Sequence, residues 1–370
     1  MGLITTLQSG FSYLSALLHK REEKSLEDLY INRFGRKLYS MFFEYYTENL
    51  WGRHPRDIAP DWGAQRMKGL SITAIIKDVF GKMLPGKKNR KVETSLIEEF
   101  SYPKLGPGQL WDVTAEEIQR LGGVILRNSR VVSLHKDDKN HITSLTYETD
   151  GQKITVEGDI FISSMPVKDL VSGMNDVPKE PARIAAGLPY RDYMTVGLLL
   201  PKLNLKNKTK IKTVSNIVPD CWVYVQDRSV QLGRFQIYNN WSPYMVKDLK
   251  HTVWIGLEYF VTEGDKYWTM PDEEFTKFAD KPEDVMDSHV ERVKKAYPAY
   301  FDTYKEIDTL VDYLKSIDNL YCVGRNGQHR YNNIDHSMMT SFETVKNIVG
   351  GIKNKDNIWN VNTEQEYHES

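Results

Sequence analysis

Two short, wholly apolar runs lie far apart in the chain and constrain its fold more than any other feature. Residues 160–162 and 320–323 have the length and composition of strands buried on both faces of a sheet. Between about residues 171 and 315, apolar and polar residues instead alternate over Tyr193–Leu200, Cys221–Gln226, Arg234–Tyr238 and Val253–Phe260. Such alternation predicts an antiparallel sheet. We therefore predict one α/β layer formed by distant segments, with an antiparallel domain inserted between them.

The amino-terminal part of the chain carries apolar residues at helical spacing. One stripe, at intervals of three and four residues, is formed by Leu3, Ile4, Leu7, Phe11, Leu14, Leu17 and Leu18. Ser25 is placed to cap a helix predicted from about Leu26 to Trp51, which Gly52 ends. A further helix is predicted over residues 72–84. The chain is therefore predicted to be helical up to about residue 85.

The hydrophobic period changes from the helical to the strand period in the next part of the chain. A helix is predicted over residues 110–121, because Gly122-Gly123 offers a left-handed carboxyl-terminal cap. Short strands then follow at 124–126, 131–135, 142–147 and 154–157. A last amphipathic helix is predicted over residues 337–349.

Composition and charge exclude several classes of protein. The 370 residues suffice for two domains with cores of their own. The 49 basic and 50 acidic residues leave a net charge of −1, which argues against a nucleic-acid binder that relies on a basic face. No apolar run approaches the length of a transmembrane helix. Two isolated cysteines, Cys221 and Cys322, suit a reducing compartment, so a cytoplasmic protein is expected.

Two apparent motifs fail on their details. Residues 81–88 resemble a P-loop, but Lys88 stands where the magnesium-binding Ser or Thr is needed, and the stretch follows a helix instead of a strand. His329, Asp335 and His336 do not have the spacing of a metal motif. We predict neither a P-loop nor a metal site.

The most informative segment leaves the second apolar run and enters the last helix. Gly324 and Gly327 allow the backbone to approach a ligand closely. The helix amino terminus offers N–H groups and the positive end of the helix dipole. Arg325, His329 and Arg330 add cationic or hydrogen-bonding groups. Because α/β sheets present ligand sites at such strand-to-helix turns, an anion or cofactor site is predicted here.

This turn also resembles a known motif. Its residues Gly324-Arg325 and His329-Arg330-Tyr331-Asn332-Asn333-Ile334-Asp335-His336 resemble the carboxyl-terminal flavin-contacting motif of UDP-galactopyranose mutases and their protoporphyrinogen-oxidase-like relatives. Both belong to the FAD-dependent amine oxidase superfamily. Further stretches resemble motifs of that superfamily in the same order, namely residues 46–52, 100–110, 128–132 and 162–166. The resemblance spans nearly the whole chain.

The resemblance implies a fold and a domain arrangement. The fold class would be α/β, with an incomplete FAD-binding Rossmann-like layer of the glutathione reductase type, an inserted antiparallel β substrate domain and a helical N-terminal region. The expected domains are a helical substrate or cap region (1–95), a part of the FAD domain with a β-meander (96–170), the antiparallel substrate domain (171–315) and the carboxyl-terminal strand, flavin turn and helix (316–370).

The resemblance also implies FAD as the cofactor. Its expected contacts are Val131, Gly324, Arg325, Asn326, Gly327, Asp335, His336 and Ser337. Expected substrate contacts are Arg234, Asn239, Trp241 and Tyr244 on the antiparallel domain, and Arg330 and Tyr331 in the turn. For the residues of the antiparallel domain, a surface aromatic loop is an equal alternative. No catalytic residue is assigned.

One part of the family pattern is absent from the sequence. Members begin with a strand, a G-x-G-x-x-G turn and a helix that hold the diphosphate of FAD. No such fingerprint occurs here, since residues 106–111 lack the third glycine. We expect that the amino-terminal βαβ unit is missing, through truncation or because a separate partner segment supplies it. The edges of the strands at 124–126 and 160–162 are then expected to be unpaired.

Three functions follow from the resemblance. The first is a FAD-dependent oxidoreductase that acts on a small molecule. The second is a UDP-galactopyranose mutase-like isomerase, in which reduced flavin attacks the anomeric carbon of a sugar nucleotide. Arg330, Tyr331 and Asp335 match the mutases, whereas Asn333 replaces a second aspartate. The third is a non-catalytic truncated chain or subunit.

Overall fold

The computed structural model describes residues 3–60, 100–279 and 284–361 of the chain. The helix predicted over 72–84 and the P-loop-like stretch 81–88 lie outside these residues. The described residues form helices, two antiparallel sheets and one parallel pair of strands. The predicted α/β class is therefore confirmed.

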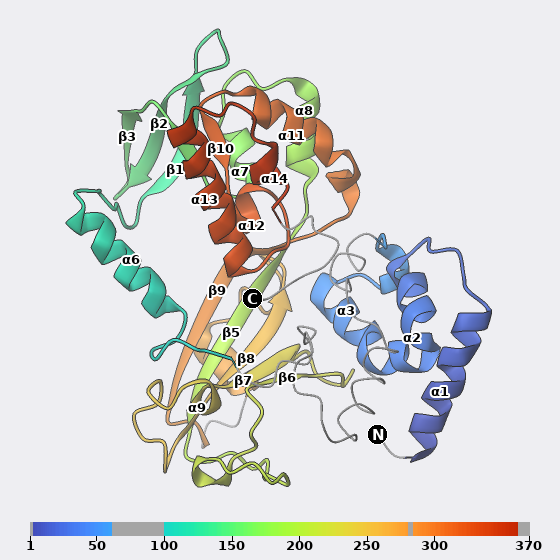
Figure 1. Cartoon of the computed structure of the whole chain (residues 1–370). Coiled ribbons are helices and arrows are strands. Elements are labelled where there is room, and N and C mark those ends of the chain that lie inside the picture. Colours follow the sequence, from blue (N-terminus) through green and yellow to red (C-terminus); the bar gives the residue numbers. More distant parts are fainter. Residues whose placement is uncertain (1–2, 61–99, 280–283, 362–370) are drawn as a thin grey trace, which may run out of the picture. The chain divides into compact units, whose positions relative to one another are not determined.

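The chain divides into two compact units (Figure 1). The first unit comprises Met1–Ile125 and Arg191–Lys294, and the second comprises Leu126–Tyr190 and Lys295–Ser370. Each unit is thus built from two separated stretches of sequence. The expected domain boundaries at 95, 170 and 315 stay predictions.

Three helices begin the first unit: α1 (Leu3–Leu18), α2 (Leu26–Phe42) and α3 (Glu44–Trp51), followed by the short η1 (Pro55–Asp57). The predicted cap is confirmed, because Ser25 Oγ accepts a hydrogen bond from the Asp28 N–H at 3.2 Å. The single helix predicted over 26–51 is wrong. The helix breaks at Phe43, and Gly35 inside α2 has a φ of +78°.

The apolar stripe of α1 faces away from α2. Phe11 is 72% exposed, whereas Ser9 and Ala16 are buried. Small residues line the contact because the two helix backbones touch: a Cβ on Gly35 would lie 2.7 Å from the Tyr13 nitrogen. Ser12 Oγ also accepts a hydrogen bond from the Lys37 N–H at 3.0 Å. The polar, small-residue side of α1 thus forms the contact with α2, which the stripe alone does not predict.

The sheet of the first unit has five strands in the order β6-β7-β8-β5-β9. Their bounds are Tyr190–Leu200 (β5), Trp222–Tyr224 (β6), Arg234–Ile237 (β7), Val253–Val261 (β8) and Asp287–Pro298 (β9). β8 is antiparallel to β5 and to β7, as predicted. The sequence did not predict β9, because charged residues interrupt its alternation. The remaining elements are α6 (Gly108–Arg120), η3 (Val214–Asn216), α9 (Tyr238–Trp241) and α10 (Asp272–Ala279).

The second unit begins with an antiparallel meander. Its strands β1 (Arg130–Lys136), β2 (Ile142–Thr149) and β3 (Gln152–Glu157) pair in sequence order, as predicted. The strand predicted over 124–126 is wrong, since these residues form no strand and Val124 is 81% exposed. No strand of the described residues pairs with this stretch, and an extended segment without a partner gains no ladder of hydrogen bonds.

The two apolar runs form a parallel pair. β4 (Phe161–Ser163) and β10 (Leu320–Cys322) are aligned so that Ile162 faces Tyr321. All of β10 is buried, as predicted for the second run. The prediction that the first run is buried on both faces is wrong, because Phe161 is buried whereas Ile162 is 50% exposed.

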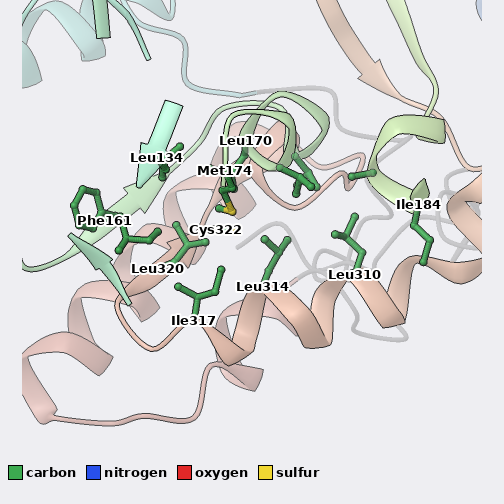
Figure 2. Close-up of a cluster of buried hydrophobic side chains, with 14 of the residues drawn as sticks. Leu134, Phe161, Leu170, Met174, Ile184, Leu310, Leu314, Ile317, Leu320 and Cys322 are labelled. Atoms are coloured by element: carbon green, nitrogen blue, oxygen red, sulfur yellow. The ribbon is translucent and has the colours of Figure 1, made fainter. Parts of the chain in front are cut away.

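One hydrophobic core joins both stretches of the second unit (Figure 2). It is covered by α7 (Val167–Ser172), α8 (Lys179–Gly187), η5 (Asp302–Glu306) and α11 (Ile307–Ser316). The figure labels its members Leu134, Phe161, Leu170, Met174, Ile184, Leu310, Leu314, Ile317, Leu320 and Cys322. After β10 the chain forms α12 (Gly324–Gly327), α13 (Ile334–Gly350) and α14 (Asp356–Trp359).

Two kinds of feature are absent from the described residues. None of their helices combines the length and apolar composition needed to cross a membrane. They also contain no group of three or more His, Cys, Asp or Glu side chains that could hold a metal ion.

The contact between α1 and α2 gives a stability prediction with an internal control. Gly35→Ala should lower the free energy of unfolding by about 1–3 kcal/mol, because Ala disfavours positive φ and its Cβ meets α1 backbone. Gly10→Ala should raise it by about 0.5–1 kcal/mol, since a Cβ there meets nothing within 4 Å and Ala favours helix. Urea unfolding followed by circular dichroism, with hydrogen exchange of α1, measures both. Equal effects of the two variants would contradict this packing.

Candidate functional site

The candidate site lies where β4 and β10 end. The strands are parallel, with Ser163 aligned to Cys322, so their carboxyl ends meet at one edge of the sheet. β10 continues through Val323 into α12, and the chain then enters α13 at Ile334. The predicted strand-to-helix turn is present, and its helix begins three residues earlier than predicted.

The two glycines of the turn have different roles. Gly324 has a φ of +74°, and its N–H donates a hydrogen bond to Thr340 Oγ1 in α13 at 2.9 Å. A Cβ on Gly324 would meet only Ser337, at 3.8 Å. A Cβ on Gly327 would lie 2.6 Å from the carbonyl oxygen of Ser163. Gly327 therefore lets α12 pack directly on the end of β4, while Gly324 is needed for its positive φ, since a Cβ there would make only ordinary contact with Ser337.

The guanidinium of Arg325 fixes the shape of the turn. Its Nε and Nη2 donate to the carbonyl of Asn332 at 3.0 and 2.6 Å, and its Nη1 donates to the carbonyl of Ala296 at 3.2 Å. The group also lies 4.7 Å from the centre of the Tyr331 ring. Most of its N–H groups thus donate to carbonyls of the second unit. The main effect of Arg325 is therefore to hold the loop in its conformation.

Arg330 and Tyr331 are held in the same way. Arg330 Nη1 donates to the carbonyls of Trp359 and of Val361, the latter at 3.1 Å. The Tyr331 N–H donates to the Tyr300 hydroxyl at 2.7 Å, and its ring stacks on Tyr297 at 5.8 Å. Both residues join the turn to neighbouring segments of the chain.

The amino terminus of α13 brings the remaining turn residues together. Ser337 Oγ donates to Asn332 Oδ1 at 3.0 Å, and Asp335 Oδ1 lies 3.2 Å from His336 Nδ1. Asn333 precedes the helix, but its side chain does not cap it. The first-turn N–H groups of a helix have no intrahelical acceptor and carry its positive dipole end. This terminus can therefore stabilise a ligand oxygen that carries partial negative charge.

Several buried polar atoms at the turn have no hydrogen-bond partner among the described residues. They include Ser163 Oγ at the end of β4, Asn326 Oδ1 in α12, Gln328 Oε1 and His329 Nδ1. An atom of this kind costs about 1–3 kcal/mol while it stays unsatisfied, so each marks a position that a water or a hydrogen-bonding ligand atom can complete. The contact of Gly327 with Ser163 places α12 against this strand end. Ser163 is not among the predicted site residues, although its position at the end of an apolar run was the available signal.

Val131 belongs to β1 and lies apart from this turn in the sequence. Its backbone is aligned with Tyr147 of β2, and the ladder is irregular between Val131 and Ser133. Its side chain is half-buried and packs against the core of the second unit. Its expected contact with the adenine of FAD stays a prediction.

His329 is a buried neutral histidine. It is fully buried and has a φ of +46°, and its Nε2 lies 3.0 Å from the carbonyl oxygen of Ala299. The rings of Tyr190 and Tyr304 lie 4.6 and 5.8 Å away. Burial lowers its pKa from 6.5 to about 4. His329 therefore adds no positive charge to the turn at neutral pH.

In the first unit, Arg234 lies among aromatic rings. Its guanidinium forms a buried ion pair with Glu258 and lies 4.6 Å from the centre of the Trp222 ring. Its Nη1 lies 3.4 Å from the Tyr46 hydroxyl. Because Glu258 compensates the positive charge of Arg234, the guanidinium would present a planar surface with little net charge to a ligand. Sequence reasoning missed Trp222 and Glu258, although the alternation of the strand around Trp222 was visible.

The other predicted residues of the first unit differ in their surroundings. Trp241 packs against Tyr102 at 5.0 Å and Trp222 at 6.4 Å, so it shares Trp222 with Arg234. Asn239 donates to the Thr252 carbonyl and accepts from the Trp254 N–H, at 3.0 and 2.9 Å, and thereby fixes the backbone. Tyr244 is exposed, with Lys104 Nζ 4.3 Å from its ring centre. The structure thus places both Arg234 and Trp241 against Trp222, whereas Asn239 holds the backbone and Tyr244 is exposed.

Sequence comparison does not place the chain in a family. No protein-family model matches it, and no curated protein matches it.

Comparison of structures does find relatives in fold. Reduced UDP-galactopyranose mutase matches with a TM-score of 0.75 and 17% identity, over 100% of this chain and 78% of the mutase. A putative protoporphyrinogen oxidase from Exiguobacterium sp. 255-15 matches with a TM-score of 0.59 and 12% identity, over 94% and 72% of the chains. A putrescine oxidase variant matches with a TM-score of 0.52 and 11% identity, over 86% and 70%. The chain is therefore similar in fold to these proteins, which agrees with the predicted α/β class.

The burial of His329 predicts a pH dependence of stability. Since its pKa is about 4 in the folded chain and 6.5 otherwise, the unfolded chain binds the proton first as the pH falls. The contribution of His329 to the free energy of unfolding should be complete above pH 6.5. It should decrease by about 2 kcal/mol between pH 7 and pH 5. His329→Asn, which tolerates positive φ, should remove this dependence in urea unfolding. The exposed His251→Asn is the control, and an unchanged dependence in His329→Asn would refute the assignment.

Proposed function

We propose that the second unit carries the flavin-ring end of the site of a FAD-dependent enzyme of the amine oxidase type. The observation that carries this proposal is the pair of unpartnered buried atoms, Ser163 Oγ and Asn326 Oδ1, at the common end of β4 and β10. The amino terminus of α13 follows in the same turn. The fold shared with the mutase and the two oxidases supports the same assignment.

The residues of the turn fit one half of FAD. A flavin ring presents both hydrogen-bond donors and acceptors along its pyrimidine edge, which neutral groups such as Ser163 and Asn326 can complete. The other half does not fit, because the sequence has no G-x-G-x-x-G turn for the diphosphate. The described residues therefore account for the ring and not for the diphosphate.

The residues of this chain would bind and polarise the ring. Bound FAD would supply the redox chemistry that side chains lack. The positive end of α13 would stabilise negative charge at the pyrimidine edge. Arg325 would keep the loop in place through Asn332. In the first unit, Arg234 and Trp241 are the proposed substrate contacts, since they share the ring of Trp222.

This proposal is tested with riboflavin, which has the ring without the diphosphate. Riboflavin should bind the chain about as tightly as FAD does, and purified chain should lack a stoichiometric flavin absorption band. Ser163→Ala and Asn326→Ala should each weaken riboflavin about fivefold, the effect of one hydrogen bond near 1 kcal/mol. Neither should lower the melting temperature, because neither atom has a partner within the described chain.

Titration of flavin fluorescence measures these affinities. Ser341→Ala is the matched control, because the Ser341 hydroxyl already donates to the Ser337 carbonyl at 3.3 Å. If both site variants bind riboflavin as the unchanged chain does, or if the chain binds no flavin, the proposed site is wrong. The remaining hypothesis is then a non-catalytic chain or subunit.

A mutase-like activity is the second candidate function. The mutase matches this chain over its whole length and with a higher TM-score than either oxidase. UDP-galactopyranose, incubated with the chain and FAD reduced by dithionite, should then yield the furanose form, and oxidised FAD should yield none. Chromatography of the sugar nucleotide measures both reactions. Absence of furanose, together with flavin binding, would favour the oxidoreductase.

A further inference from the structure

The loop that joins β5 to β6 in the first unit concentrates positive charge (Figure 1). We call residues 201–219 the lysine loop, since they include no acidic residue and five lysines, Lys202, Lys206, Lys208, Lys210 and Lys212. The loop thus contributes five of the 49 basic residues of the chain and none of the 50 acidic ones. The rest of the chain then carries a net charge of −6, so the nearly neutral total does not describe this segment.

The lysine loop has a defined conformation. Its base is closed by an antiparallel bridge between Lys206 and Ile217, and Ile217 is buried in a hydrophobic core of the first unit. Beyond the base, Asn207 Oδ1 accepts a hydrogen bond from the Thr209 N–H at 2.8 Å, and Asn207 Nδ2 donates to the Ile211 carbonyl at 2.7 Å. The Asn207 side chain therefore fixes a turn at the tip of the loop, and the lysines of the tip extend from a defined backbone.

The charge of the lysine loop is not neutralised by ion pairs. All five lysines are exposed, and none of them forms an ion pair within the part of the chain that the structure describes. A neighbouring segment adds a sixth exposed lysine, since Ser215 Oγ donates to the Lys250 carbonyl at 2.8 Å. The acidic residue of that segment, Asp248, lies 3.0 Å from His251 Nδ1. Lysines gathered in this way repel one another and favour an anionic partner.

Exposed apolar side chains stand among these lysines. Leu205, Ile211 and Val214 are exposed, Ile211 by 62%, and every residue from 208 to 212 is exposed as well. Single-stranded nucleic acids bind to basic surfaces with aromatic side chains for stacking, and the lysine loop contains no aromatic residue. A bilayer with anionic lipids instead offers negative headgroups above an apolar layer. The loop therefore has both components that such a bilayer requires.

We propose that the lysine loop binds the surface of a membrane that contains anionic lipids, with Ile211 between the headgroups and the lysines on the lipid phosphates. The long lysine side chains permit this arrangement, because their apolar stems can lie beside the acyl chains while the ammonium groups stay among the headgroups. Binding of this kind requires no membrane-spanning helix. The inference goes beyond the proposed function, since it involves neither flavin nor the turn of the second unit.

Sedimentation of the full chain with lipid vesicles tests the proposal. Vesicles of phosphatidylcholine with about 30% phosphatidylserine should bind the chain at least about tenfold more tightly than vesicles of phosphatidylcholine alone. The difference should diminish as the salt concentration is raised from about 0.05 M to about 0.5 M, because salt screens the attraction between lysines and headgroups. Equal binding to both kinds of vesicle, or no binding to either, would overturn the proposal.

Two triple variants with the same change of net charge make the test specific for the loop. Replacing Lys208, Lys210 and Lys212 by Gln should weaken binding about 100-fold, since each lysine near an anionic surface contributes about fivefold. The control replaces by Gln three exposed lysines of the second unit, Lys153, Lys179 and Lys353. It should change binding by no more than about twofold. Circular dichroism confirms that both variants are folded, and equal weakening in the two would refute the assignment to the loop.

Ile211→Ser distinguishes a membrane from a soluble polyanion. It should weaken binding to the phosphatidylserine vesicles about fivefold, because an apolar side chain no longer enters the bilayer. Its affinity for heparin, a polyanion without an apolar layer, should equal that of the unchanged chain. Vesicle binding that is unchanged in Ile211→Ser would overturn the proposal and identify the loop as a site for soluble polyanions, nucleic acids included.

Discussion

One buried ammonium group holds together the part of the second unit on which the candidate site depends. Lys355 is 4% exposed, and its Nζ donates to the carbonyls of Ile317 and Leu320 at 2.5 and 2.8 Å. The first of these carbonyls ends α11 and the second lies in β10. Burial lowers the pKa of Lys355 to about 8, and the carbonyl dipoles at the end of a helix favour its charge. The same group thus caps a helix, closes a sheet edge and fixes the strand that leads into the turn.

The cationic side chains of the turn are hydrogen-bonded within the second unit and are not free for a ligand. Arg325 and Arg330 donate to carbonyls of the second unit, and His329 is neutral because it is buried. What remains for a ligand are neutral hydrogen-bonding atoms and the amino terminus of α13. This set suits a polar ring with partial negative charge better than a phosphate, which needs several N–H groups or cations. The guanidinium groups that suggest an anion site in the sequence instead build the loop that presents the neutral groups.

The sequence predicted elements whose pattern is local and missed those set by distant contacts. The meander, β10 and the turn follow from alternation, apolar runs and glycine placement. The outward direction of the α1 stripe depends on the close approach at Gly35, which no local pattern contains. The break at Phe43 and the strand β9 depend on tertiary packing in the same way. Within the site, the positions of the glycines were predictable, but which polar atoms lack a partner was not, because partners such as Asn332 for Arg325 are set by the folded loop.

Ser163 belongs both to the candidate site and to the strand pair that supports it. Its carbonyl accepts the Val323 N–H, Gly327 packs against it, and its unpartnered Oγ lies at the end of β4. The backbone that positions this hydroxyl is therefore held by β10 and by α12. A larger residue at position 327 would push α12 away from the same carbonyl oxygen, because a Cβ there would lie only 2.6 Å from it. The packing of the turn on β4 and the position of the unpartnered hydroxyl thus depend on the same contact.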